Sequence, residues 1–242
     1  YKGRKEEFSG SRTRSILNKF TPFSIIRELK WVIKGKQNFI PLTEAEFAVD
    51  LDQFGMHGVC DIGLRQLKKV SKERFFERRT EIYEIYQEIK TCDAVLITLG
   101  NLEQVFDSNS KPWEQVPTDI AINRKIKFDI EHNKSLKQVT DEVLEICNLT
   151  KNLNNKVKII LTVSPVPMRR TFSKNNIFLE NFKNKSLLCQ ACKNINIENV
   201  FYFPSFEIIS FYGVAAFEED LRHIKSEPVV KVCDVFKKFV NI

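Results

Sequence analysis

Three runs of apolar residues predict short strands that alternate with helices along the chain. The runs cover residues 93–99 (DAVLITL), 156–163 (KVKIILTV) and 199–203 (NVFYF). Short unbroken apolar runs are typical of strands that are buried on both faces of a parallel sheet. A Gly or Pro within two residues of each run marks the end of the strand.

Apolar positions at helical spacing predict helices between and around these runs. The expected helices are residues 24–34, 70–89, 124–153, 175–194 and 228–240. Residues 36–62 are expected to be a loop with short elements, and residues 107–120 a loop. Because strands and helices alternate, we expect an α/β fold, a three-layer α/β/α sandwich with a mostly parallel central sheet. One domain would span residues 1–242, with a basic, irregular segment at residues 1–17.

Composition and charge exclude several classes of protein. The chain has 242 residues, of which 43% are apolar and 29% charged, as in ordinary globular proteins and unlike collagen or disordered tails. No run approaches the ~18 apolar residues that a membrane span needs. The net charge is +7, and residues 1–36 hold ten Lys or Arg against three Glu. This excess lies at one end and is interrupted by acids, so a solvated segment or a site for an anionic substrate group fits better than a nucleic-acid surface.

The cysteines favour a reducing compartment, and we expect a cytoplasmic location. Among six Cys the only close pair is Cys189 and Cys192, which lies inside an expected helix. No second pair and no nearby His completes a zinc set, so free buried thiols are expected, without a metal or cofactor. The first residue is Tyr rather than Met, and we expect an N-terminally trimmed piece.

His223 is the most informative of three histidines. Asp220 precedes it by three residues and can orient the imidazole through its Nδ1 hydrogen, which leaves Nε2 free to accept a proton. The alternative is a solvent-facing polar loop. His57 lies in a Gly-flanked loop that could border a site, and His132 is expected on a charged surface.

Other candidate residues follow the strands, where sites of parallel sheets lie. Backbone N–H groups at Gly100 and Asn101, and the Asn101 amide, could stabilise an oxyanion, and Glu103 and Ser164 could contact substrate. An ordinary turn explains these residues equally well. Ser205, which like Ser164 adjoins a Pro, fits a turn-forming role. Arg169 and Arg170 follow the second strand and could bind an anionic group, although a solvated basic turn is the simpler interpretation.

Four blocks in order resemble the GSCFA family, a branch of the SGNH (GDSL-like) hydrolases. The blocks are residues 18–25 (NKFTPFSI), 95–106 (VLITLGNLEQVF), 162–167 (TVSPVP), and 184–188 (NKSLL) followed by 202–208 (YFPSFEI). Asp220 and His223 then fall where SGNH enzymes carry the acid and base of their triad. The resemblance covers residues 15–236.

The resemblance implies an SGNH-hydrolase-like sandwich with a Ser nucleophile, and a Gly and an Asn-like donor in the oxyanion hole. Two departures stand out. The nucleophile motif Gly-Ser-Cys-Phe-Ala is absent; Ser9 and Ser11 are poor substitutes, so the resemblance puts the motif upstream of Tyr1. Leu102 stands where the family carries a polar Thr.

The resemblance therefore implies an ester hydrolase or O-acyltransferase that acts on a small-molecule or glycan ester without a cofactor. A chain that begins at Tyr1 would itself be inactive. Two rivals stay open: a non-catalytic glycan-binding or scaffolding relative, favoured by the two departures, and a nucleic-acid binder that uses the basic N-terminal end.

Overall fold

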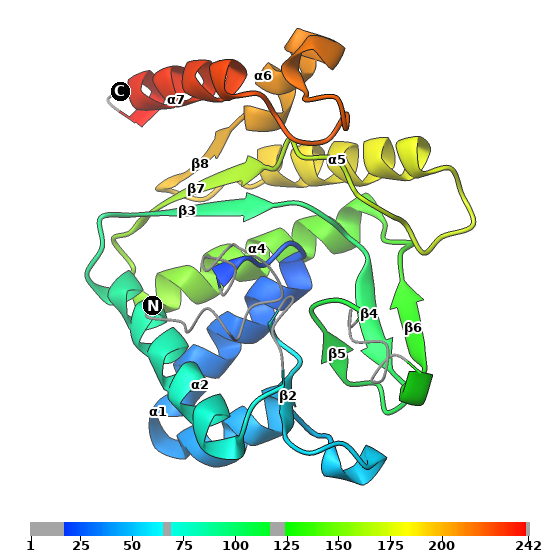
Figure 1. Ribbon diagram of the computed structural model, residues 1–242. Coiled ribbons are helices and arrows are strands. Elements are labelled where there is room, and N and C mark those ends of the chain that lie inside the picture. Colours follow the sequence, from blue (N-terminus) through cyan, green and yellow to red (C-terminus); the bar gives the residue numbers. More distant parts are fainter. Residues whose placement is uncertain (1–16, 65–68, 117–123, 241–242) are drawn as a thin grey trace.

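A three-stranded parallel sheet forms the centre of the molecule (Figure 1). The computed structural model describes residues 17–64, 69–116 and 124–240. The strands lie in the order β3 (Ala94–Leu99), β7 (Lys158–Val163) and β8 (Val200–Phe203). Leu96 stands opposite Ile160, and Leu161 opposite Tyr202. The three strands predicted from apolar runs are confirmed.

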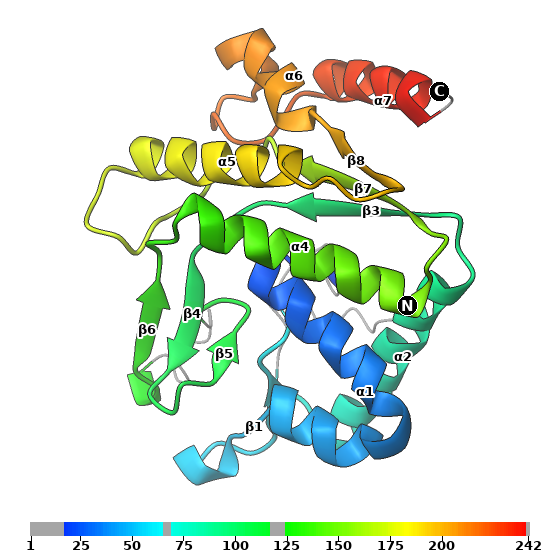
Figure 2. The same ribbon diagram turned by 180° about the vertical axis from the view of Figure 1, so that it is seen from behind.

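Two helices cover one face of this sheet, α4 (Leu136–Leu153) and α5 (Ile177–Lys193) (Figure 2). Every second side chain of β3 and β7 enters a shared core with these helices, including Leu99, Leu161 and Val163. The first turn of α4 is closed by a capping box, in which Ser135 and Gln138 satisfy each other's backbone N–H groups. This amphipathic packing confirms the helices expected in both segments.

The opposite face of the sheet is only partly covered. Helix α7 (Ser226–Val240) packs Phe236 and Phe239 against Phe203 of β8, with ring centroids 4.9 and 5.4 Å away. On β3, however, Leu96 is 54% exposed, so the expectation that this strand is buried on both faces is wrong. The chain is α/β with a parallel sheet, but a three-layer sandwich is not confirmed, because the described residues leave this face of β3 uncovered.

Helix α1 (Pro22–Phe47) is longer than its sequence pattern predicts. It begins at the N-cap Thr21, whose hydroxyl accepts from the N–H of Ser24, and it continues past a kink at Asn38 and through Pro41. Residues 36–47 were expected to be a loop, and that expectation is wrong. Phe39 and Phe47 pack against the buried Trp31, and this tertiary contact holds the second half of the helix in place.

Helix α2 (Lys72–Gln87) crosses α1, begins at its N-cap Ser71 and is followed by the 3₁₀ turn η4 (Glu88–Lys90). It confirms the helix expected at 70–89. In the segment between α1 and α2, β1 (Ala48–Asp50) pairs with β2 (Val59–Asp61) around the turn η3 (Asp52–Phe54).

A second antiparallel sheet lies below the carboxyl end of β3 (Figure 1). It consists of β4 (Gln104–Asp107), β5 (Pro112–Trp113) and β6 (Phe128–Glu131). The helix expected from residue 124 is therefore wrong over β6. Ile126, Phe128 and Ile130 alternate with polar residues and pack against the core around Trp113, as a half-buried strand does.

The chain leaves β8 into α6 (Ser205–Tyr212) and the short turn η5 (Gly213–Ala216), which lead to the loop before α7. Ser205 begins α6 as a structural residue: its buried hydroxyl donates to the carbonyl oxygen of Val163 at 2.8 Å. None of the helices in the described parts of the chain is long and apolar enough to cross a membrane.

Candidate functional site

A pocket of about 380 Å³ lies at the carboxyl ends of β3 and β7. The loops after both strands contribute to it, as expected for a parallel sheet. Four of the residues that line it are candidates from the sequence: Gly100, Asn101, Glu103 and Ser164. Glu114 and Arg222 line it as well, and the sequence did not mark them as candidates. Arg169 and Arg170 also line it. Tertiary folding thus brings together five separate segments of the chain, including residues 20–21 ahead of α1.

Asp220 and His223 form a hydrogen-bonded couple in a tight turn before α7. The turn is closed by the N–H of Glu218, which donates to the carbonyl oxygen of His223 at 2.7 Å, and by Leu221, whose φ of 52° lies in the left-handed region. This conformation lets one carboxylate oxygen of Asp220 accept the backbone N–H groups of Arg222 and His223, at 3.0 and 2.9 Å. The other oxygen accepts from Nδ1 of His223.

The hydrogen bonds in this turn keep Asp220 ionised. The backbone N–H and the ring of His223 hold the pKa of Asp220 at about 2, below its ordinary value. Nε2 of His223 has no hydrogen-bond partner among the described residues, so it is free to accept a proton. The geometry is that of an acid-oriented imidazole, and its catalytic role stays a prediction.

The couple lies beside the pocket rather than inside it. Both side chains are about half exposed, and neither lines the pocket. The residue between them, Arg222, does line it, and its Nε donates to the carbonyl oxygen of Pro167 at 3.4 Å. This contact joins the turn of the couple to the loop that follows β7.

The backbone donors at Gly100 and Asn101 are already used. Both N–H groups donate to the carbonyl oxygen of Phe20, at 2.9 Å each. The Gly100 N–H is therefore not free to bind an oxyanion, which differs from the expectation. The Asn101 side-chain oxygen accepts the N–H groups of Leu102 and Glu103, at 2.8 and 3.2 Å, so its amide nitrogen is the donor that this loop still offers.

Glu103 and Ser164 stabilise loops around the pocket. The buried carboxylate of Glu103 accepts from the hydroxyl of Thr171 and from the N–H of Phe172, and so holds the loop after β7 in place. The N–H of Ser164 donates to the carbonyl oxygen of Leu99 at 2.7 Å, and its hydroxyl accepts from the N–H of Val166 at 3.3 Å. Their substrate contacts stay a prediction that rests on position alone.

Two buried ionisable residues near the pocket carry no motif that sequence reasoning could detect. Lys185 of α5 donates to the carbonyl oxygen of Gly100 at 2.8 Å, and burial lowers its pKa to about 8. Glu114 follows β5, and neither of its buried carboxyl oxygens makes a hydrogen bond of good geometry in the described chain, although the Ser24 hydroxyl lies near enough to affect its pKa. Burial raises the pKa of Glu114, and nearby Lys19 and Ser24 offset this only in part.

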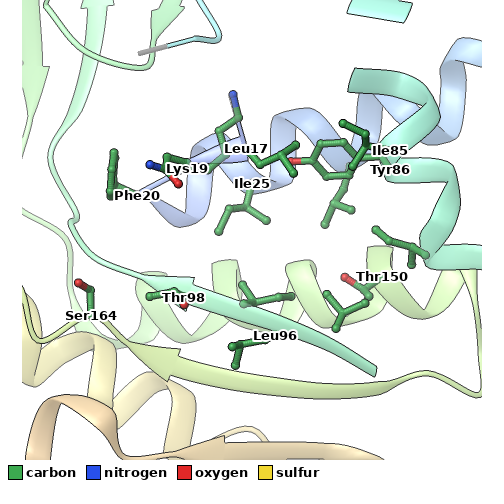
Figure 3. Close-up of a pocket in the computed structure, with 15 residues that line it drawn as sticks. Leu17, Lys19, Phe20, Ile25, Ile85, Tyr86, Leu96, Thr98, Thr150 and Ser164 are labelled. Carbon is green, nitrogen blue, oxygen red and sulfur yellow. The ribbon is translucent and has the colours of Figure 1, made fainter. Parts of the chain in front are cut away.

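A second, mostly apolar cavity of about 500 Å³ runs along β3 (Figure 3). Leu96 and Thr98 of β3 line one side, and Ile25 of α1 and Tyr86 of α2 line the other. Ser164 borders both cavities. The cavity shows that β3 lacks close packing on this side within the described residues.

The remaining candidate residues lie away from both cavities. His57 pairs with Asp52 at 3.0 Å in an exposed turn, and Nδ1 of His132 contacts the carbonyl oxygen of Ile130 at 3.1 Å. Cys189 and Cys192 are free thiols, and of the two only Cys192 is buried as expected. Within the described residues no group of three or more His, Cys, Asp or Glu is placed to hold a metal ion. Ser9 and Ser11 lie outside the described residues.

Comparison with known proteins gives one match. Searches of curated proteins and of solved structures returned no significant relative. Nothing in the comparisons bears out the expected N-terminal truncation. The model of the GSCFA family matches residues 3–236, nearly the whole chain, in agreement with the resemblance of the four sequence blocks. The chain therefore belongs to the GSCFA family.

Proposed function

We propose that this protein performs serine-type acyl-ester chemistry, as an ester hydrolase or O-acyltransferase that acts on an acylated carbohydrate or a related ester. The observation that carries the proposal is the couple of Asp220 and His223, with Nε2 unoccupied and a pocket next to it. Family membership supports the same chemistry through the resemblance to SGNH hydrolases.

His223 is the general base in this mechanism. Its Nε2 removes the proton from a serine hydroxyl as the serine oxygen attacks the carbonyl carbon of the ester. The tetrahedral intermediate then collapses, and the leaving alkoxide takes the proton back from His223. Water or a sugar hydroxyl, activated in the same way, removes the acyl group from the serine. Asp220 keeps the imidazole oriented and stabilises its charged form throughout.

The amide nitrogen of Asn101 is our candidate donor to the oxyanion, because the backbone donors of this loop already bind Phe20. One such donor is typically worth ~3–4 kcal/mol of the barrier. The family's nucleophile motif does not occur in residues 1–242, so the serine itself is left to experiment. Among the described strands β3 pairs only with β7, and the cavity beside it borders Ser164 at the pocket.

The test is the substitution His223→Ala in a protein that includes any residues its gene encodes ahead of Tyr1. We expect hydrolysis of p-nitrophenyl acetate and of acetylated sugars to fall at least ~1000-fold, the scale of losing a triad base. The control is His57→Ala, because His57 also pairs with a carboxylate in an exposed turn but lines neither cavity. Turnover in His223→Ala that equals that of the unsubstituted protein and of His57→Ala would remove His223 from the mechanism.

The nucleophile has a separate test. The chain from Tyr1 to Ile242 is treated with a serine-directed fluorophosphonate probe, and the labelled residue is located by intact mass and peptide mapping. Stoichiometric labelling of Ser9 or Ser11 would identify that residue as the nucleophile, and no labelling would exclude both serines from the mechanism.

The bonded N–H of Gly100 and the buried side chain of Leu102 favour a second function, that of a non-catalytic glycan-binding or scaffolding relative. The Gly100 N–H is occupied, and Leu102, which is 1% exposed, replaces a polar residue of the family with a buried apolar one. Glycan binding that persists in His223→Ala, without ester turnover in the unsubstituted protein, would establish this alternative.

A further inference from the structure

We propose that the pocket at the strand ends binds a sugar that carries an anionic group, with Arg169, Arg170 and Arg222 around the anion and Glu114 bonded to a hydroxyl. This inference rests on the proposed function, because it names the class of substrate. Binding can nevertheless be measured without turnover, so the two proposals can fail separately.

Three arginines line the pocket. Arg169 and Arg170 come from the loop after β7, and Arg222 comes from the turn before α7. The bond from Arg222 to the carbonyl oxygen of Pro167 joins the turn before α7 to the loop after β7, although the two residues are more than 50 positions apart along the chain. Arginine recognises carboxylate and phosphate groups through paired N–H donors, so three arginines in the lining of one pocket favour an anionic ligand.

No described carboxylate neutralises these arginines. Ion pairs among the described residues include none of the three. Arg170 stacks over the ring of Phe172, 5.2 Å from its centroid, and the described bond of Arg222 goes to a backbone carbonyl. Glu103 also lines the pocket; its Oε1 accepts from Thr171 and Phe172, and it forms no ion pair with these arginines. The guanidinium charges are therefore available to a ligand.

Glu114 supplies the second half of the argument, because its buried carboxyl group makes no hydrogen bond of good geometry within the described residues, although Lys19, Ser24 and Arg27 lie near it. It is 9% exposed, and both carboxyl oxygens are shielded from solvent and unbonded within the described chain. Leaving such a group unpaired is costly, and a ligand hydroxyl would remove that cost. Because burial favours its neutral form, it suits a hydroxyl better than a cation.

The size of the pocket agrees with a sugar. Ligand sites usually measure ~300–1,000 Å³, and this pocket of about 380 Å³ is at the lower end. It therefore fits one sugar unit rather than a long glycan. The anion can be a carboxylate of a uronic acid or a phosphate ester, and both share the chemistry that arginine recognises.

The test measures binding to the chain from Tyr1 to Ile242 by titration calorimetry. The probes are glucuronate, glucose 6-phosphate, uncharged glucose and inorganic phosphate. We expect one of the two charged sugars to bind at least ~10-fold more tightly than glucose and than inorganic phosphate, and the better of the two identifies the anion. Equal affinity for charged and uncharged sugars overturns the proposal. Inorganic phosphate that binds as tightly as the sugars reduces the pocket to a simple anion site and overturns the assignment to a sugar.

Variants separate the two halves of the site. The double substitution Arg169→Gln with Arg170→Gln should weaken binding of the charged sugar at least ~10-fold, whereas Arg124→Gln, an exposed arginine outside the pocket, should not change it. Glu114→Gln keeps a neutral hydrogen-bonding group and should bind within ~3-fold of the unsubstituted chain; Glu114→Leu should lose at least ~10-fold. Thermal unfolding of each variant verifies folding. Unchanged binding in the arginine variant, or in Glu114→Leu, overturns the proposal.

The outcomes for the two proposals are distinct. If His223→Ala retains both sugar binding and full ester turnover, the proposed mechanism fails while the binding site stands. If ester turnover depends on His223 but no charged sugar binds, the proposed function stands and this inference fails.

Discussion

At the residue scale, hydrogen bonding decides which polar groups of the backbone and side chains remain available for chemistry. Nε2 of His223 has no partner among the described residues, whereas the N–H of Gly100 is bound to Phe20, although both residues are candidates in the sequence. The spacing of Asp220 and His223 suffices to predict their contact because only a local turn has to form. No spacing could predict the bond of Gly100, because Phe20 lies 80 residues away in the chain.

Lys185 provides a pH-dependent prediction. Its pKa is about 8 in the folded protein and near 10.5 when unfolded, so the unfolded chain binds more protons between these values. Stability therefore rises with pH in this window, by about 1 kcal/mol between pH 7 and pH 9. We measure the free energy of unfolding in urea for wild type and for Lys185→Met. From pH 7 to pH 9 we expect the wild type to gain about 1 kcal/mol of stability relative to the variant.

Because the two proteins share every other ionisable group, the pH dependence of the difference between their unfolding free energies reports Lys185 alone. Lys193→Met is the matched control, because Lys193 lies in the same helix but is exposed. It should show no such dependence on pH. A constant difference for Lys185→Met from pH 7 to pH 9 would contradict the lowered pKa.

At the element scale, the parallel strands have two unequal faces. Leu161 on the central strand β7 is fully buried under α4 and α5, whereas Leu96 on β3 is 54% exposed. The apolar runs predict both strands correctly, since each run is long enough for one strand. They do not predict the exposed face of β3, because a residue's own polarity does not tell which helix will cover it.

The two leucines give a matched pair of substitutions. Leu161→Ala should lower the free energy of unfolding by ~2–5 kcal/mol, because it leaves a cavity in the core. Leu96→Ala should cost much less, since its side chain already contacts solvent and the open cavity. Chemical denaturation measures both. A cost for Leu96→Ala as large as that for Leu161→Ala would show that β3 is covered on this face in solution.

At the scale of the whole molecule, a buried ionic cluster joins α1, α2 and β2. Arg79 of α2 donates to Asp61 at 2.8 Å and to both carboxylate oxygens of Glu28 at 3.1 Å, and it stacks on Phe47, 3.5 Å from the ring centroid. Lys19 pairs with Glu28 at 2.8 Å. Arg79 and Lys19 hold the pKa of Glu28 at about 2 despite its burial.

The substitution Arg79→Met should destabilise the protein by ~3–5 kcal/mol, because it leaves two buried carboxylates with too little positive charge. Urea denaturation at pH 7 is the measurement. Lys72→Met is the control, since Lys72 pairs with Glu44 in solvent and its loss should change stability little. A loss below ~1 kcal/mol for Arg79→Met would mean that the cluster contributes little to holding these elements together.

The sequence by itself determined the parallel strands, most of the helices and the contact between Asp220 and His223. Each of these depends on residues that are near one another along the chain, so local apolar pattern and turn geometry are sufficient. Only the tertiary structure decided that α1 continues through Pro41, that residues 128–131 form a strand, and that three arginines surround one pocket with Glu114. These features depend on packing between distant segments, which lowers the free energy of conformations that local propensity alone does not favour.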